Sequence, residues 1–167
     1  MQFFTRAWLA GELTDEEYAS SLSGYHQHLA NISAHLSSQV REFIKVVDLH
    51  DGLIRKIVID HTEKTLGLDL RCGNLQVGYY DVDIQYRGIQ LGRPVVAILA
   101  GVAQAEGEIL SDELDIVDDG GFEHRIIFDS YEEISILFGD LVFKKTMQDG
   151  RYFPAATKKV IVVGKFS

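Results

Sequence analysis

The chain has 167 residues, 46% of them hydrophobic, and a formal net charge of −9. This length and composition predict one domain over residues 1–167 with a buried core. The acidic balance argues against a nucleic-acid-binding protein, which needs clustered Lys and Arg, and the longest apolar run, residues 95–103, is far shorter than the about 20 residues that cross a membrane.

Two helix starts are visible near the N-terminus. Thr14 is followed three residues later by Glu17, a capping pattern that predicts a helix from Asp15. Upstream, Thr5 is a candidate cap for a short helix that ends at Gly11. Phe3, Phe4 and Trp8 are expected to dock on the same core.

The segment 18–47 carries apolar residues every three or four positions, which gives one apolar stripe along a helix. A single helix of that length would be about 45 Å long, so we expect a break near Ser37 and Ser38. The stripe predicts which side chains are buried against the rest of the fold: Leu29, Ile32, Leu36 and Phe43.

The apolar pattern changes from helical spacing to alternation at Gly52. Residues 53–60 and 65–72 predict a hairpin. Two further strands are expected at 75–80 and 81–87, where aromatic and β-branched residues are frequent.

The last part of the chain predicts more strands. Pro94 argues against an uninterrupted central strand, but the short apolar run after it still favours a strand. The expected strands are residues 95–103, 108–117, 122–128, 133–138, 141–144 and 158–163, with Lys158 and Lys159 available to the acidic pair before them. Helices in 1–50 followed by strands in 53–167 predict an α+β fold, with N-terminal helices on a mainly antiparallel sheet or half-barrel.

The stretch 106–140 holds twelve carboxylates and a single Lys or Arg, Arg125. Such an asymmetry indicates an acidic surface that would steer a basic protein partner toward the chain. The residues expected on this partner-binding surface are Asp112, Glu113, Asp115, Asp118, Asp119 and Glu123. They lack the spacing of a calcium-binding loop, so no metal site is predicted.

Two histidine–carboxylate pairs are weaker candidates for a site. His50 and Asp51 precede Gly52 at a helix-to-strand corner, which could hold an imidazole and a carboxylate at fixed angles, although Asp before Gly is also ordinary turn chemistry. Asp115 would lie opposite His124 if residues 117 and 122 pair, and a one-residue slip would remove that contact.

Motifs that define common enzyme classes are absent from the sequence: there is no phosphate-binding loop, dinucleotide fingerprint, zinc-protease helix or nucleophile elbow. These absences favour a binding protein over an enzyme, and no cofactor is expected. The only cysteine, Cys72, is expected to be an inert core thiol. The chain starts without a signal-peptide pattern, so a cytoplasmic location is expected.

Several short motifs resemble a family of bacterial proteins catalogued as a domain of unknown function. They are FFTRAW at 3–8, LHDGLI at 49–54, Asp112-Glu113, FEHRIIF at 122–128 and EISILF at 133–138. The resemblance implies a small cytosolic α+β protein and carries over no catalytic residue. The size and acidity are also similar to those of immunity proteins, which bind and block bacterial toxins.

Two hypotheses of function follow from the sequence. In the first, the chain is an immunity-type binding protein that engages a basic protein, such as a toxin, through its acidic surface. In the alternative, it is a small metal-dependent or small-molecule enzyme that uses the corner at His50 and Asp51. A cavity that converges on His50 would favour the alternative. A homodimer is compatible with either hypothesis.

Overall fold

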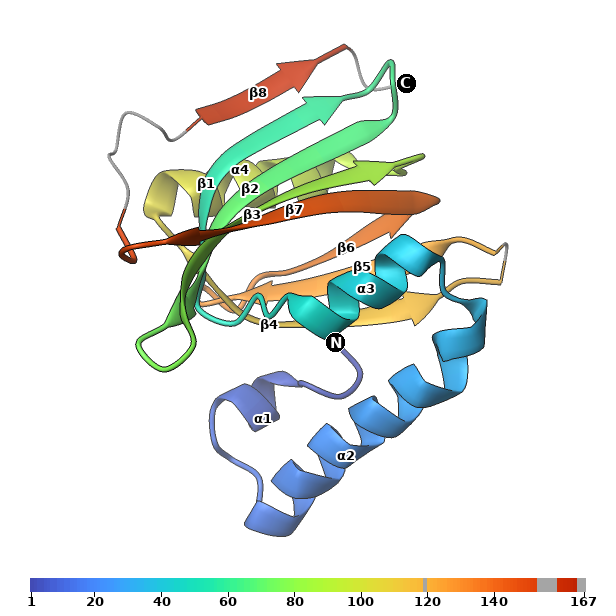
Figure 1. The fold of residues 1–167 in the computed structure, drawn as a ribbon, viewed down its shortest axis with the longest axis vertical. Helices are drawn as coiled ribbons and strands as arrows, with labels where there is room; N and C mark the ends of the chain where they lie inside the picture. Colours follow the sequence, from blue (N-terminus) through green and yellow to red (C-terminus); the bar gives the residue numbers. More distant parts are fainter. Residues whose placement is uncertain (119, 153–158, 165–167) are drawn as a thin grey trace.

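The computed structural model describes residues 1–118, 120–152 and 159–164 (Figure 1). The helices are α1 (Arg6–Leu9), α2 (Asp15–Ile32), a short 3-10 turn (Ser33–His35), α3 (Ser38–Val46) and α4 (Arg93–Ala105). The strands are β1 (Gly52–Asp60), β2 (Thr65–Asn74), β3 (Gly78–Arg87), β4 (Glu108–Ile116), β5 (Phe122–Phe128), β6 (Glu133–Phe138), β7 (Asp140–Gln148) and β8 (Lys159–Val163).

Local capping determines where the N-terminal helices begin. The Thr14 hydroxyl accepts from the Glu17 amide, and the Glu17 carboxylate accepts from the Thr14 amide, so the predicted capping box is formed. The Thr5 hydroxyl accepts from the Trp8 amide at the start of α1, and the Ser37 hydroxyl accepts from the Val40 amide at the start of α3. The expected break of the long helix is confirmed, because the chain leaves α2 after Ile32 and starts α3 at Ser38.

The strands form an eight-stranded sheet in the order β6-β5-β4-β1-β2-β3-β7, and β8 adds to β1. All neighbouring pairs are antiparallel except β1 with β8, which is parallel. Helices and a mainly antiparallel sheet confirm the predicted α+β class. The tail does form a last strand, but it pairs with β1, and Lys158 lies outside the described residues.

The sheet curls so strongly that distant strands face each other. In the strand order β3 and β5 are four steps apart, which would be about 19 Å in a flat sheet. Nevertheless the Tyr86 hydroxyl of β3 lies 2.7 Å from Nδ1 of His124 on β5. The chain also passes directly from β6 to β7 through Gly139, whose amide donates to the Arg87 carbonyl. The open sheet is therefore curled into a half-barrel, one of the two forms predicted from the sequence.

Two helices close the half-barrel. α3 packs against β7, and α4 lies on the other side in contact with β1, β6 and β8 (Figure 1). Ile32, Leu36 and Phe43 are buried in a core shared with the strands, as predicted, whereas Leu29 is only partly buried. α1 and α2 lie at the end of the molecule opposite β8, with α2 in contact with β4 (Figure 1). None of the described helices is both long and apolar enough to cross a membrane.

The prediction of a strand at 95–103 is wrong, because this run lies in α4. Pro94 sits in the first turn of the helix, where its missing amide hydrogen costs nothing. Glu106 ends the helix in a left-handed conformation with φ 61°. The split into strands at 75–80 and 81–87 is also wrong: β3 is one strand, and residues 75–77 form the turn before it.

The predicted register of the acidic strand pair is wrong by one residue. Ile116, not Val117, pairs with Phe122, because the Val117 amide donates to the Gly121 carbonyl and closes a longer connection. Asp115 therefore lies opposite Glu123, and His124 lies opposite Leu114. The expected contact between Asp115 and His124 does not form.

Candidate functional site

A cavity of about 870 Å³ lies between α1, α2, α3 and β4. Six aromatic side chains contribute to its wall: Phe4, Trp8, Tyr18, Tyr25, Phe43 and Tyr131. Its polar lining residues are His26, Asp48, His50, Ser111 and Asp112. A partly open, mainly aromatic and aliphatic cavity with a few polar groups is the usual form of a small-molecule site.

The cavity exists because β4 separates from β1. The two strands pair only where Gly52 and Leu53 meet Ile109 and Glu108. Beyond that point α2 lies beside β4, and the Tyr25 hydroxyl accepts from the Leu114 amide at 2.8 Å. Burial, followed by the charge of Asp112, raises the pKa of Tyr25, so this hydroxyl stays protonated. A helix thus covers a strand edge and leaves an open space beneath it.

A buried histidine connects the core to this cavity. His124 is 0% exposed; its Nε2 lies 2.9 Å from Oδ2 of Asp112, and its Nδ1 lies 2.7 Å from the Tyr86 hydroxyl. Asp112 and His124 meet as diagonal neighbours on β4 and β5, since Asp112 pairs with Ile126. The Asp112 side chain is 22% exposed and lines the cavity.

The chemistry of the three groups assigns their roles. An ionised carboxylate only accepts, so His124 donates its Nε2 hydrogen to Asp112. In the neutral imidazole Nδ1 then accepts from Tyr86, whose pKa is raised by complete burial. The chain of bonds fixes the Asp112 carboxylate in one orientation, while no described residue donates to its other oxygen, Oδ1. Asp112 is therefore a preorganised acceptor at the cavity wall.

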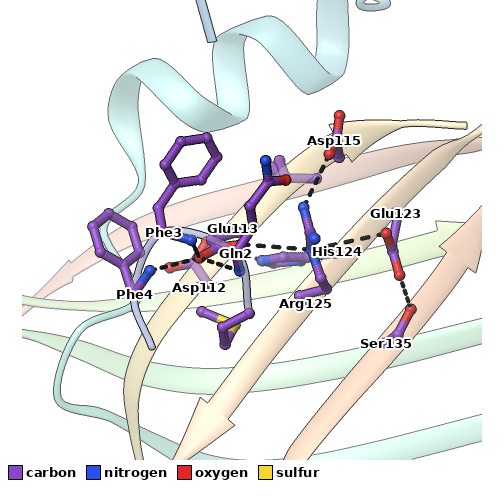
Figure 2. Close-up of polar contacts among 12 residues, drawn as sticks. Gln2, Phe3, Phe4, Asp112, Glu113, Asp115, Glu123, His124, Arg125 and Ser135 are labelled. Carbon is purple, nitrogen blue, oxygen red and sulfur yellow. Dashed lines mark hydrogen bonds and ion pairs between the residues drawn. The ribbon is translucent and has the colours of Figure 1, made fainter. Parts of the chain in front are cut away.

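Glu113 has a different role, because its carboxylate is 0% exposed. It accepts from the backbone amides of Gln2, Phe3 and Phe4 at 2.6–3.0 Å (Figure 2). We call residues 2–4 the N-terminal strap. Since the strap carries Phe4 and leads into α1 with Trp8, Glu113 holds part of the cavity wall in place.

Arg125 lies among three acids on this side of β4 and β5. Its guanidinium lies 3.0 Å from Asp115, 3.6 Å from Glu113 and 3.8 Å from Glu123 (Figure 2). Asp115 also contacts His28 of α2 at 3.0 Å, and Glu123 accepts from the Ser135 hydroxyl. Glu113 and Asp115 thus attach the strap and α2 to the sheet. Glu113 is fully buried, and Asp115 and Glu123 are only partly exposed.

Trp8 lies on the wall of the cavity with its indole stacked on Tyr18, the ring centroids 4.4 Å apart and 9° from parallel. Its Nε1 hydrogen is buried, and no acceptor for it is found among the described residues. A buried donor without an acceptor costs about 1–3 kcal/mol. The indole N–H is thus a donor in the wall of the cavity that the described residues leave unsatisfied.

Of the two residues at the corner before β1, His50 lines the cavity and Asp51 does not appear among the described lining residues. Nδ1 of His50 donates to the Leu110 carbonyl at 2.6 Å, and its Nε2 lies 3.4 Å from the Asp51 carboxylate. His50 remains 59% exposed, so it sits at the rim.

The structure thus divides the residues predicted from the sequence. Asp112 and His124 come together, and His50 shares their cavity. Glu113, Asp115 and Glu123 surround Arg125; Asp118 is exposed in the turn between β4 and β5, and Asp119 lies outside the described residues. Sequence analysis missed Tyr86 and the strap. The density of aromatic residues in positions 3–25 was the available signal for the cavity wall.

Within residues 1–118, 120–152 and 159–164, no group of three or more His, Cys, Asp or Glu side chains could hold a metal ion. Comparison of the chain with known protein families, with curated proteins and with solved structures finds no match in any of the three. The family resemblance drawn from short motifs therefore stays a prediction.

Proposed function

We propose that this chain is a small-molecule-binding protein whose ligand occupies the cavity between α1, α2, α3 and β4. The observation that supports this most is the cavity of about 870 Å³ with the fixed acceptor Asp112 on its wall. Typical small-molecule sites measure about 300–1,000 Å³ and combine an apolar lining with few convergent polar groups. The alternative hypothesis from the sequence is a small metal-dependent or small-molecule enzyme that uses the corner at His50 and Asp51. The position of His50 on the rim supports the small-molecule binding in that hypothesis.

The surroundings of the cavity also support the proposal. Tyr131 lines it with a left-handed backbone, φ 59°, which a bulky residue rarely adopts. Such strain is often retained at ligand sites. The buried indole hydrogen of Trp8 lacks an acceptor among the described residues. A ligand with an apolar body would cover the aromatic wall.

A variant that fills the cavity tests the proposal. Leu22 of α2 and Leu110 of β4 both line it, so replacing both with tryptophan adds bulk from two walls. We expect the neutral dye N-phenylnaphthylamine to bind the native chain with a saturable fluorescence increase. In the double variant its affinity should fall by about tenfold or more, which corresponds to about 1.4 kcal/mol.

The matched control is Leu75→Trp, because Leu75 is 91% exposed in the turn between β2 and β3, and this change makes one of the same replacements away from the cavity. Cooperative unfolding in urea shows that each variant is folded. Unchanged dye affinity in the folded double variant, or no saturable binding to the native chain, would reject the proposal.

As a second proposal, the acidic exterior attracts a basic protein partner. It is favoured by exposed acids in the two turns beside β5: Asp118 in one turn, and Asp129 and Glu132 in the other. Asp112, Glu113 and Asp115 are engaged by His124, the strap and Arg125, so their removal would disturb the fold as well as the charge. Replacing the exposed acids of the turns, Asp118, Asp129 and Glu132, changes the surface charge but leaves those contacts in place.

For this second proposal we expect the triple variant Asp118→Asn, Asp129→Asn, Glu132→Gln to keep its stability but to associate more slowly with a basic protein captured by the native chain. The rate should fall by about tenfold at low ionic strength. The difference should shrink near about 0.5 M salt, where the Debye length is about 4 Å. Stopped-flow kinetics measures both rates. Equal rates at low salt, or failure to capture any basic protein, would reject the acidic surface.

A further inference from the structure

We infer that the ligand of the cavity is an organic cation, an ammonium or similar group on an apolar body. The inference rests on the proposed function and specifies the class of ligand. Its first support is charge: the described lining includes the carboxylates of Asp48 and Asp112 but neither lysine nor arginine. An anionic ligand would find no lysine or arginine to pair with among the described lining residues, whereas a cationic ligand would find carboxylate acceptors at the wall.

Asp112 is the group best placed to receive the cation. Its Oδ2 is held by the Nε2 hydrogen of His124, and its Oδ1 has no donor among the described residues. His124 is in turn fixed by Tyr86 and by an edge-on contact with Phe43, the ring centroids 6.0 Å apart. A carboxylate that is oriented before binding loses little freedom when a donor arrives.

The aromatic wall favours the same chemistry. Cations are attracted to the faces of Trp, Tyr and Phe rings within about 6 Å of the centroid, more strongly where water is excluded. The aromatic rings of the lining contact one another in a continuous series. The ring centroid of Phe4 lies 4.9 Å from that of Trp8 and 5.0 Å from that of Tyr25, and Trp8 stacks on Tyr18. Several rings beside a carboxylate form a suitable environment for an ammonium group.

Three probes of similar size test the class of ligand. Phenethylamine is cationic at neutral pH, phenethyl alcohol is neutral, and hydrocinnamate is anionic. Trp8 is the only tryptophan of the chain and lines the cavity, so its fluorescence reports on binding, and ligand-observed NMR gives an independent measurement. We expect phenethylamine to bind about tenfold or more tightly than either other probe at low salt.

The variant Asp112→Asn isolates the charge. Asparagine keeps an oxygen that can accept from His124, so the fold should persist. We expect this variant to lose about tenfold in affinity for phenethylamine and to bind phenethyl alcohol as the native chain does. Asp83→Asn is the control, since Asp83 is exposed on β3 and is not among the described residues of this cavity wall.

The outcomes distinguish the two proposals. If none of the three probes binds, the cavity is not a ligand site and the proposed function fails with the inference. If phenethyl alcohol or hydrocinnamate binds as tightly as phenethylamine, or if Asp112→Asn leaves phenethylamine binding unchanged, the cavity remains a binding site but its ligand is not a cation. Preference for the cation that is lost in Asp112→Asn and kept in Asp83→Asn supports the inference.

Discussion

Replacing Glu113 with alanine is expected to lower the free energy of unfolding by about 3–5 kcal/mol, the range for breaking a buried ion pair. The change removes the acceptor of three strap amides and an ion-pair partner of Arg125. Urea unfolding measures the loss. Hydrogen exchange of the Gln2, Phe3 and Phe4 amides should lose its protection in the variant, because their bonds end on the missing carboxylate.

Glu113→Gln and Glu132→Ala are the controls for this prediction. Glutamine keeps one acceptor oxygen but loses the charge, so we expect about half the loss of the alanine variant, since charge-assisted bonds are about twice as strong as neutral ones. Glu132 is exposed in the turn after β5, and its replacement should change stability by less than about 0.5 kcal/mol. A loss below about 1 kcal/mol in Glu113→Ala would show that the strap contributes little to stability.

The parts of the fold that depend on local chemistry could be predicted from the sequence. Caps at Thr5 and Thr14 act within one helical turn, and the alternation after Gly52 reflects burial on one side of a strand. The buried residues Leu66, Leu68, Leu70 and Cys72 share one side of β2. Burial raises the pKa of Cys72 to about 12, which fits the inert thiol expected from the sequence.

The strand predicted at 95–103 and the predicted register of β4 with β5 were wrong, because both features depend on more than the local pattern of apolar residues. The nine apolar residues in α4 show no periodicity that separates a helix from a strand. Several of them are small, which suits a closely packed helix. Pro94 lies in the first turn of α4, a position where proline favours a helix start. The register of β4 and β5 depends on how the connection from Val117 to Gly121 closes. A single hydrogen bond there moves every later pair by one residue.

The candidate site was harder still to predict, because it joins residues that only the tertiary fold brings together. Asp112 and His124 could be paired only with the correct register, and Tyr86 reaches His124 only because the sheet curls. The acidic composition of 106–140 indicated an exposed surface. In the structure the strap and α2 use several of those acids internally, so composition alone overestimated the charge presented to a partner.

The bond between Tyr86 and His124 gives a second large effect. His124→Phe keeps an aromatic ring but removes two hydrogen bonds and leaves the Tyr86 hydroxyl buried without a partner. We expect a loss of about 2–4 kcal/mol in the free energy of unfolding. Tyr86→Phe removes one bond and leaves Nδ1 of His124 unpaired, with an expected loss of about 1–2 kcal/mol.

The double variant of His124 and Tyr86 decides whether the two residues act as a unit. With both polar groups replaced by phenylalanine no unpaired donor is left between β3 and β5, so we expect the double variant to be no less stable than His124→Phe alone. Tyr79→Phe, on a half-exposed position of β3, is the control and should cost less than about 0.5 kcal/mol. Losses that simply add in the double variant would show that Tyr86 does not support His124, and the orientation of Asp112 at the cavity would then need another source.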